Sequence, residues 1–184
     1  MKGVVFDLFQ EVVSQRYGES SWDELLDAAQ LDGAYTSLGS YPDEDFRRLV
    51  EAGSSALSID AFELVRWFGR NALPLLASRY PHFFTPHQSA RPFVLTLNDI
   101  IHPEVRKLYP GADVPTFDFD HSASDALVMT YGSPRKLCAF AEGLIEGAAA
   151  YYGETATIAQ LACMYRGDPK CVLRISFGAA WAAA

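Results

Sequence analysis

The first group in the sequence that could do chemistry is a single histidine with apolar neighbours. His102 lies in the segment NDIIHPEVRKLYPG, beside Ile100, Ile101 and Val105. A neutral imidazole in a dry pocket is suited to binding a heme iron, because no water competes for the metal. A histidine that simply fills a core fits the same local pattern. Pro103 follows directly, and proline disfavours helical geometry at the preceding residue, so we expect a kink beside the histidine.

Three side chains that form hydrogen bonds alternate in the run YGSPR, namely Tyr131, Ser133 and Arg135. On extended backbone, alternate residues share one face, so the three donors are expected to converge on one anionic group. Two hydroxyls and a guanidinium suit a carboxylate, which arginine can hold with two hydrogen bonds. The alternative is a strand end that carries ordinary polar surface residues.

Three cysteines form the third group of interest. Cys138 opens an expected helix, and Cys163 and Cys171 flank the last expected turn. Thiolates from a helix start and a hairpin could bind zinc, but spacings of 24 and then 7 residues match no standard zinc pattern. An odd number of cysteines forms no disulfide framework, which favours a reducing cytoplasm.

Length and charge limit the classes of function. The chain has 184 residues, 49% of them hydrophobic, which is enough for one domain with both a core and a lined cavity. The net charge of −8 argues against nucleic acid or an anionic membrane surface as a partner, since both reward clustered positive charge. No apolar run reaches the ~20 residues of a membrane span.

Periodicity predicts helices in the first two-thirds of the chain, over residues 2–17, 22–29, 43–56, 60–77 and 93–108, with Ser21 capping the second. The last third is expected to hold strands at 114–120, 126–131, 154–162 and 171–177, a polar turn at 121–125 and one helix at 136–152. Strands that occur only in the last third of the chain and are interrupted by one helix indicate an α+β domain with an antiparallel sheet. We treat residues 178–184 as a tail.

The order of the motifs resembles that of one known family. MKG at the start, WDELL from Trp22, the His102 segment, Val114-Pro115, the YGSPR run and GLIEG from Gly143 follow one another as in heme nitric oxide/oxygen binding (H-NOX) domains. Within this family the sequence resembles a bacterial stand-alone member, related to the sensor domain of soluble guanylate cyclase. The resemblance covers residues 1–177.

This resemblance implies a fold and a set of roles. A helical distal subdomain, about residues 1–65, would pack on a proximal subdomain, residues 66–177, that contains a four-stranded antiparallel sheet, with heme b between them. His102 would be the proximal iron ligand, and Tyr131, Ser133 and Arg135 would bind the propionates. Pro115 would press on the porphyrin, and Leu144 and Ala148 would line the pocket.

The distal side decides which gas is bound. Oxygen-binding relatives use a tyrosine supported by a tryptophan and an asparagine, and the matching positions here are Phe140, Phe9 and Ala72. None of these side chains can donate a hydrogen bond to bound dioxygen. We therefore expect binding of NO and CO without a stable oxygen complex.

The resemblance also suggests an output. NO would weaken the bond between His102 and iron, and the signal would pass to a histidine kinase, or to a diguanylate cyclase or phosphodiesterase of cyclic-di-GMP. No catalytic constellation remains, so a sensor is expected rather than an enzyme. A heme enzyme is the alternative, although the chain offers no distal histidine or arginine.

The cysteines leave a further alternative open. Some relatives hold zinc with three cysteines and a histidine, and the histidine position is Gln160 here, which is a poor ligand. The three cysteines would then form either a three-thiolate zinc site or a group of buried thiols. Such a group could sense redox state, because accessible thiolates oxidise.

Overall fold

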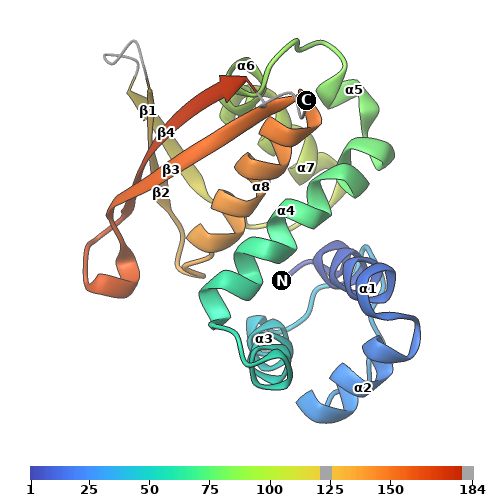
Figure 1. Cartoon of the computed structure of the whole chain (residues 1–184). Helices are drawn as coiled ribbons and strands as arrows, with labels where there is room; N and C mark the ends of the chain where they lie inside the picture. Colours follow the sequence, from blue (N-terminus) through green and yellow to red (C-terminus); the bar gives the residue numbers. More distant parts are fainter. Residues whose placement is uncertain (121–125, 180–184) are drawn as a thin grey trace, which may run out of the picture.

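The chain begins with helices and ends with a sheet (Figure 1). The computed structural model describes residues 1–120 and 126–179. The helical part comprises α1 (Gly3–Tyr17), α2 (Ser20–Ala29), α3 (Asp43–Leu57), α4 (Ala61–Arg79), α5 (Pro81–Phe84), α6 (Ala90–Leu95), the π-helical turn η1 (Leu97–Ile101) and α7 (His102–Leu108). The rest comprises β1 (Thr116–Asp120), β2 (Leu127–Gly132), α8 (Cys138–Tyr151), β3 (Glu154–Ala162), the 3-10 turn η2 (Met164–Arg166) and β4 (Cys171–Ala179).

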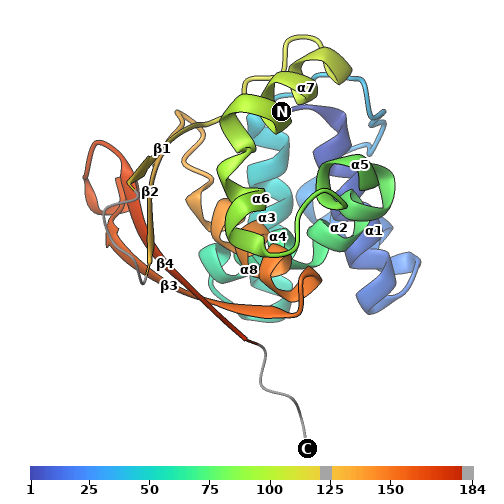
Figure 2. The ribbon, with the colours of Figure 1, turned by 90° about the horizontal axis from the view of Figure 1, so that it is seen from above.

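The four strands form one antiparallel sheet in the order β1-β2-β4-β3. Helix α8 packs on the side of the sheet that faces the other helices (Figure 2). Register places Phe117 opposite Tyr131 and Met129 opposite Leu173. The expected α+β fold with a four-stranded antiparallel sheet is therefore confirmed. The expected turn at 121–125 lies outside the described residues.

Helices α4 and α8 have the most extensive contact of any pair of described helices, and they cross at the centre of the molecule (Figure 1). Glycines allow their backbones to approach closely. A Cβ on Gly143 would lie 2.0 Å from the carbonyl oxygen of Arg66, and one on Gly69 would lie 2.5 Å from the carbonyl oxygen of Phe140. Real Cβ atoms do not come this close, so only glycine fits at these two positions.

The apolar side chains form two clusters on either side of this helix pair. One lies among α1, α2, α3 and α4 and is built on rings such as Phe6, Phe46 and Phe68. The other fills the space between the sheet and helices α4, α6 and α8, and includes Leu127 and Leu173. The clusters share half-buried side chains of α4, so α4 is a wall of both.

Several expected boundaries are corrected. Ser21 does not cap α2: the helix begins at Ser20, two residues before the expected Trp22, and the Ser21 hydroxyl donates to the carbonyl of Tyr17 at 2.9 Å. Strand β4 continues to Ala179, paired with Glu154, so the expected tail loses its first two residues to the sheet. The last five residues of that tail lie outside the described part of the chain.

The expected helix over 93–108 is divided into α6, η1 and α7. The N–H of His102 donates to the carbonyl of Leu97, a π-type bond, and His102 itself keeps helical dihedrals of −65° and −38°. The irregularity therefore precedes the histidine instead of lying at it. Pro103, which lacks a backbone N–H, follows in the first turn of α7.

No helix within residues 1–120 or 126–179 combines the length and the apolar character needed to cross a bilayer.

We expect Gly143→Ala to destabilise the protein. The new methyl group must push α8 away from the Arg66 carbonyl, and overpacking of this kind costs about 1–3 kcal/mol, more than the roughly 1 kcal/mol that alanine gains over glycine in a helix. Gly178→Ala is the control, because its Cβ would lie 3.5 Å from the nearest atom, Thr155 Oγ1. Urea unfolding would measure both, and equal stability of the two variants would contradict the close contact.

Candidate functional site

An apolar cavity of about 420 Å³ lies between α7, β1 and β2 on one side and α1, α4 and α8 on the other. This volume falls in the range of about 300–1,000 Å³ that is typical of small-molecule sites. Most of its wall is hydrocarbon, from Val5, Leu8, Leu73, Leu76, Phe93, Val94, Leu97, Ile101, Val105, Phe140, Leu144 and Ile145. Of the three described histidines, only His102 lines it.

His102 is presented by the first turn of α7. Its ring stacks on that of Phe117 in β1, with centroids 5.4 Å apart and planes 26° apart. Burial, with a smaller effect of Arg106, lowers the pKa of His102 to about 4. The imidazole is therefore neutral at pH 7, and a neutral imidazole is the form that can donate an electron pair to a metal.

Tyr131, Ser133 and Arg135 all line one edge of this cavity. The hydroxyl oxygen of Tyr131 accepts from the N–H of Leu137 at 3.0 Å, and burial raises the pKa of Tyr131 to about 12, so the phenol stays protonated. The Ser133 hydroxyl oxygen accepts from the N–H of Arg135 at 3.3 Å.

The reason for this convergence differs from the expected one. Strand β2 ends at Gly132, and Pro134 and Arg135 lie in a turn that the N–H of Lys136 closes on the carbonyl of Ser133 at 3.1 Å. Only Tyr131 is on extended strand backbone. The turn, not strand alternation, brings the arginine to the same cavity edge.

Arg135 joins the two ends of the fold at this edge. Its Nε donates to both carboxylate oxygens of Asp43 at 2.9 Å, and its Nη1 donates to the carbonyl and carboxylate of Asp113 at 2.7 and 3.0 Å. The N-terminal ammonium of Met1 also donates to Asp43, at 2.6 Å. Burial acts to raise the pKa of Asp43, but hydrogen bonds from the ammonium and Arg135 outweigh it and hold that pKa below its usual value.

Asp43 and Asp113 are members of the site that the sequence did not predict. Asp43 is separated from Arg135 by 92 residues and Asp113 by 22. No periodicity connects residues so far apart, and an aspartate at the first residue of a helix is ordinary, because it faces the positive end of the helix dipole. Only the folded chain brings them to the arginine.

The remaining expected pocket residues divide into two groups. Pro115, Leu144 and Phe140 line the cavity. Ala148 does not: it is fully buried one turn further along α8, inside the core beneath the sheet.

Phe9 and Ala72 also lie outside the wall and are fully buried in the helical cluster. The ring of Phe68 lies between Phe9 and the cavity, since its centroid is 4.7 Å from that of Phe9 and 5.0 Å from that of Phe140. Phe140 is thus the member of the expected distal set that meets the cavity.

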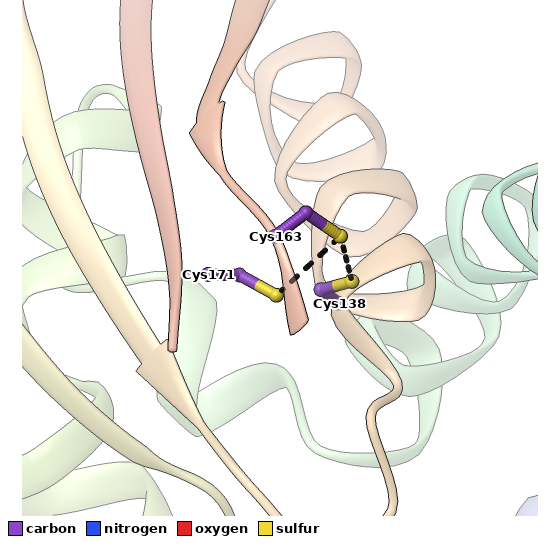
Figure 3. A group of neighbouring side chains, drawn as sticks. All are labelled: Cys138, Cys163 and Cys171. Atoms are coloured by element: carbon purple, nitrogen blue, oxygen red, sulfur yellow. Dashed lines mark hydrogen bonds between the residues drawn. The ribbon is translucent and has the colours of Figure 1, made fainter. Parts of the chain in front are cut away.

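The three cysteines gather at the junction of α8 with the β3–β4 hairpin (Figure 3). The sulfur of Cys163 lies 4.0 Å from that of Cys138 and 3.9 Å from that of Cys171, and all three sulfurs lie within 4.8 Å of one another. All are buried. Burial, followed by the neighbouring cysteines, raises the pKa of the Cys138 thiol, and burial also raises that of Cys171.

Gln160 lies beside this thiol group but is occupied elsewhere. Its amide nitrogen donates to the Glu142 carboxylate at 2.9 Å and lies 3.9 Å from the Cys138 sulfur. Glu142 is itself buried and lies 3.5 Å from the Arg66 guanidinium. The position therefore serves a hydrogen-bond network and offers the thiols no fourth ligand of histidine type.

The residues of the apolar cavity fit a heme. An apolar chamber suits the macrocycle, a neutral imidazole suits the iron, and an edge with an arginine, a serine and a protonated tyrosine suits the propionate carboxylates. These features come from different elements, α7, β2 and the turn before α8, and meet in one cavity.

Comparison with known proteins agrees with this geometry. Residues 2–160 match the family model Haem-NO-binding (HNOB). An H-NOX protein from S. oneidensis, solved in the Fe(II)NO state, is 31% identical, with 96% of this chain and 99% of that chain covered and a TM-score of 0.90. An H-NOX from Shewanella woodyi, solved in the Fe(II)CO state, is also 31% identical, with coverage of 100% and 97% and a TM-score of 0.81.

A third structure, the unliganded Fe(II) H-NOX protein from K. algicida, is 24% identical, with complete coverage of both chains and a TM-score of 0.86, and shares the fold. The family match spans most of the chain, and the Shewanella proteins exceed 30% identity over nearly its whole length. The chain belongs to the Haem-NO-binding, or H-NOX, family.

Proposed function

We propose that this protein is a heme-based sensor of nitric oxide that also binds CO and forms no stable complex with oxygen. The observation that carries the proposal is one neutral imidazole, His102, in an apolar cavity whose edge presents Tyr131, Ser133 and Arg135. Relatives at 31% identity have been solved in Fe(II)NO and Fe(II)CO states. Bound heme would supply an iron that binds diatomic gases.

In this proposal each group of the cavity has one task. His102, on α7, would bind the iron, and Phe117 would hold its ring in place by stacking. Arg135, Ser133 and Tyr131 would bind the propionates. The Arg135 guanidinium would also keep its hydrogen bonds to Asp43 and Asp113, because it has five N–H donors and one propionate carboxylate does not use all of them. Pro115, from the chain just before β1, and Leu144, from α8, pack against the macrocycle.

The choice of gas rests on Phe140. Iron-bound dioxygen carries partial negative charge and needs a hydrogen-bond donor, whereas NO binds ferrous heme tightly without one. The Phe140 ring lines the cavity from α8, and the rings of Phe68 and then Phe9 lie behind it. These three rings have no hydrogen-bond donor, and a stable complex with dioxygen would require one at this position.

We further propose that the signal starts when His102 is released from the iron on NO binding. The chain would act as two subdomains, about 1–65 and 66–177, that shift relative to each other, without catalysis of its own. A histidine kinase, or a diguanylate cyclase or phosphodiesterase, would receive the signal. Three free thiols fit a cytoplasmic location.

The direct test is the absorption spectrum of the heme-loaded protein, reduced without oxygen and then exposed to CO, NO or air. We expect a five-coordinate ferrous spectrum that shifts with CO and NO and shows no oxygen complex. A stable complex in air would contradict the assignment of the gas. Failure to take up heme after reconstitution would contradict the function itself.

Phe140→Tyr tests the distal assignment. The added hydroxyl can donate a hydrogen bond to bound dioxygen, so we expect an oxygen complex that is slow to decay, while CO binding changes little. Charge-assisted hydrogen bonds contribute about 1.5–3 kcal/mol, which corresponds to a roughly 10- to 150-fold slower loss of oxygen. Phe68→Tyr is the control, since Phe68 does not line the cavity. An unchanged oxygen response in Phe140→Tyr would place the bound gas elsewhere.

The cysteines support a second, independent proposal, a zinc site of three thiolates. Zinc–sulfur bonds of about 2.3 Å in a tetrahedral site place the sulfur atoms about 3.8 Å apart, and two of the distances here are 3.9 and 4.0 Å. The N–H of Met164 lies 3.4 Å from the Cys171 sulfur, where it would stabilise a thiolate. Without metal, these buried thiols would react slowly, which makes a thiol redox sensor the weaker alternative.

Metal analysis of the purified protein tests this site. We expect about one zinc per chain, lost in Cys163→Ser and bound more tightly in Gln160→His, which adds an imidazole beside Cys138. Heme content should not change in either variant, because the cysteines do not line the apolar cavity. A wild-type protein that takes up no zinc from a supplemented buffer would leave a cluster of structural thiols.

A further inference from the structure

The segment that carries His102 has few attachments to the rest of the protein. On the side away from the cavity, η1 and α7 expose Asp99, Ile100, Arg106 and Lys107 to solvent. Within the described residues, two hydrogen bonds from side chains join residues 97–109 to other elements. One is from Asn98 Nδ2 to the carbonyl of Phe117 in β1, at 2.7 Å. The other joins the hydroxyls of Tyr109 and Tyr80.

The tyrosine pair lies at the far end of the helix from the histidine. Tyr109 is the residue at which α7 stops, and its N–H donates to the carbonyl of Val105 at 2.8 Å. It lies seven positions after His102, which is about two helical turns, so both side chains leave the helix on nearly the same side. Both line the apolar cavity, and Tyr109 is only 7% exposed.

Its partner belongs to the rigid part of the fold. Tyr80 is the residue between α4 and α5, and its N–H donates to the carbonyl of Leu76 at 2.9 Å while its carbonyl accepts from the N–H of Phe83 at 3.1 Å. Helix α4 is in turn held against α8 at Gly69 and Gly143. The backbone that carries Tyr80 is therefore held in place at both its N–H and its carbonyl.

We propose that Tyr109, through its hydroxyl contact with Tyr80, is a positioning residue that holds the C-terminal end of α7 and opposes the release of His102 from iron. Asn98 holds the other end of the segment. When His102 withdraws, α7 must move relative to α4, and the contact between the two tyrosines is lost in that movement. The inference rests on the proposed function, because it concerns how readily NO displaces the histidine.

The test compares Tyr109→Phe with wild type in the heme-loaded protein. We expect the ratio of five- to six-coordinate NO complex, and the rate at which the six-coordinate form converts, to rise about two- to tenfold, the range that the loss of one net hydrogen bond produces. Absorption spectra over a range of temperatures give the ratio, and stopped-flow mixing with NO gives the rate. Tyr80→Phe should have the same effect, and the double variant should add nothing to either.

Tyr152→Phe is the matched control. It removes a phenol hydroxyl that donates to the carbonyl of Phe84 at 2.8 Å, on elements other than α7. A merely structural effect of losing a buried tyrosine hydroxyl would appear in this variant too, so it should leave the ratio and rate unchanged. Thermal unfolding would show whether the variants are equally folded.

The outcomes separate the two claims. If wild type forms NO complexes but Tyr109→Phe has the wild-type ratio and rate, the positioning role is wrong and the sensor function stands. An effect shared by Tyr152→Phe also contradicts the positioning role. If wild type takes up no heme or keeps His102 bound in all NO complexes, the proposed function fails first.

Discussion

The close contact of α4 with α8 is the constraint on which the rest of the structure depends. Glycines at positions 69 and 143 let one backbone lie directly on the other, where any side chain would collide with a carbonyl. This contact fixes the shared wall between the two apolar clusters. It also fixes the distal side of the cavity, because Phe140 and Leu144 lie on α8 next to the glycines, and Leu73 and Leu76 lie on α4.

Opposite this rigid wall is a lightly attached segment. The π turn and α7 carry His102, and the helix ends at Tyr109. The contrast follows from composition, since α4 and α8 offer glycine, alanine and leucine to each other, whereas α7 has charged residues on its outer side. A sensor needs both properties, a fixed surface that defines the cavity and a ligand that can move away from it.

Ion pairs at the edge of the cavity connect segments that lie far apart in the sequence. Arg135 lies after β2, Asp113 lies in the loop after α7, and Asp43 opens α3 and also binds the N-terminal ammonium. The helical N-terminal part and the sheet-containing part are thereby linked through the same arginine that faces the cavity. A carboxylate bound at this edge would meet a group already held in place, so little ordering of the side chain would be required.

Much of the fold could be predicted from the sequence, because it depends on local periodicity. The helical stripe of residues 3–17 and the alternation in the last two strands are each visible within about ten residues. The division of the helix around His102 into three pieces could not be predicted to the residue. A proline indicates an interrupted backbone, but neighbouring packing decides on which side of it the interruption lies.

The site was predictable to a different extent. His102 and the YGSPR run are distinctive in type and spacing, and the structure brings them to one cavity. Asp43 and Tyr80 join them only through contacts between distant segments, which no local pattern records, and the role of Tyr109 depends on its contact with Tyr80. Ala148 and Phe9 show the opposite case: their residue types suit a pocket wall, but they lie one layer behind it.

The central claim is that His102 is the protein ligand of the heme iron. Resonance Raman spectroscopy of the ferrous protein tests it most directly, with His102→Ala compared with His87→Ala, a histidine outside the cavity. The account predicts an iron–histidine stretching band in wild type and His87→Ala. That band should be absent in His102→Ala, and added ¹⁵N-imidazole should restore a band shifted by the isotope. An iron–histidine band that persists in His102→Ala would contradict the assignment.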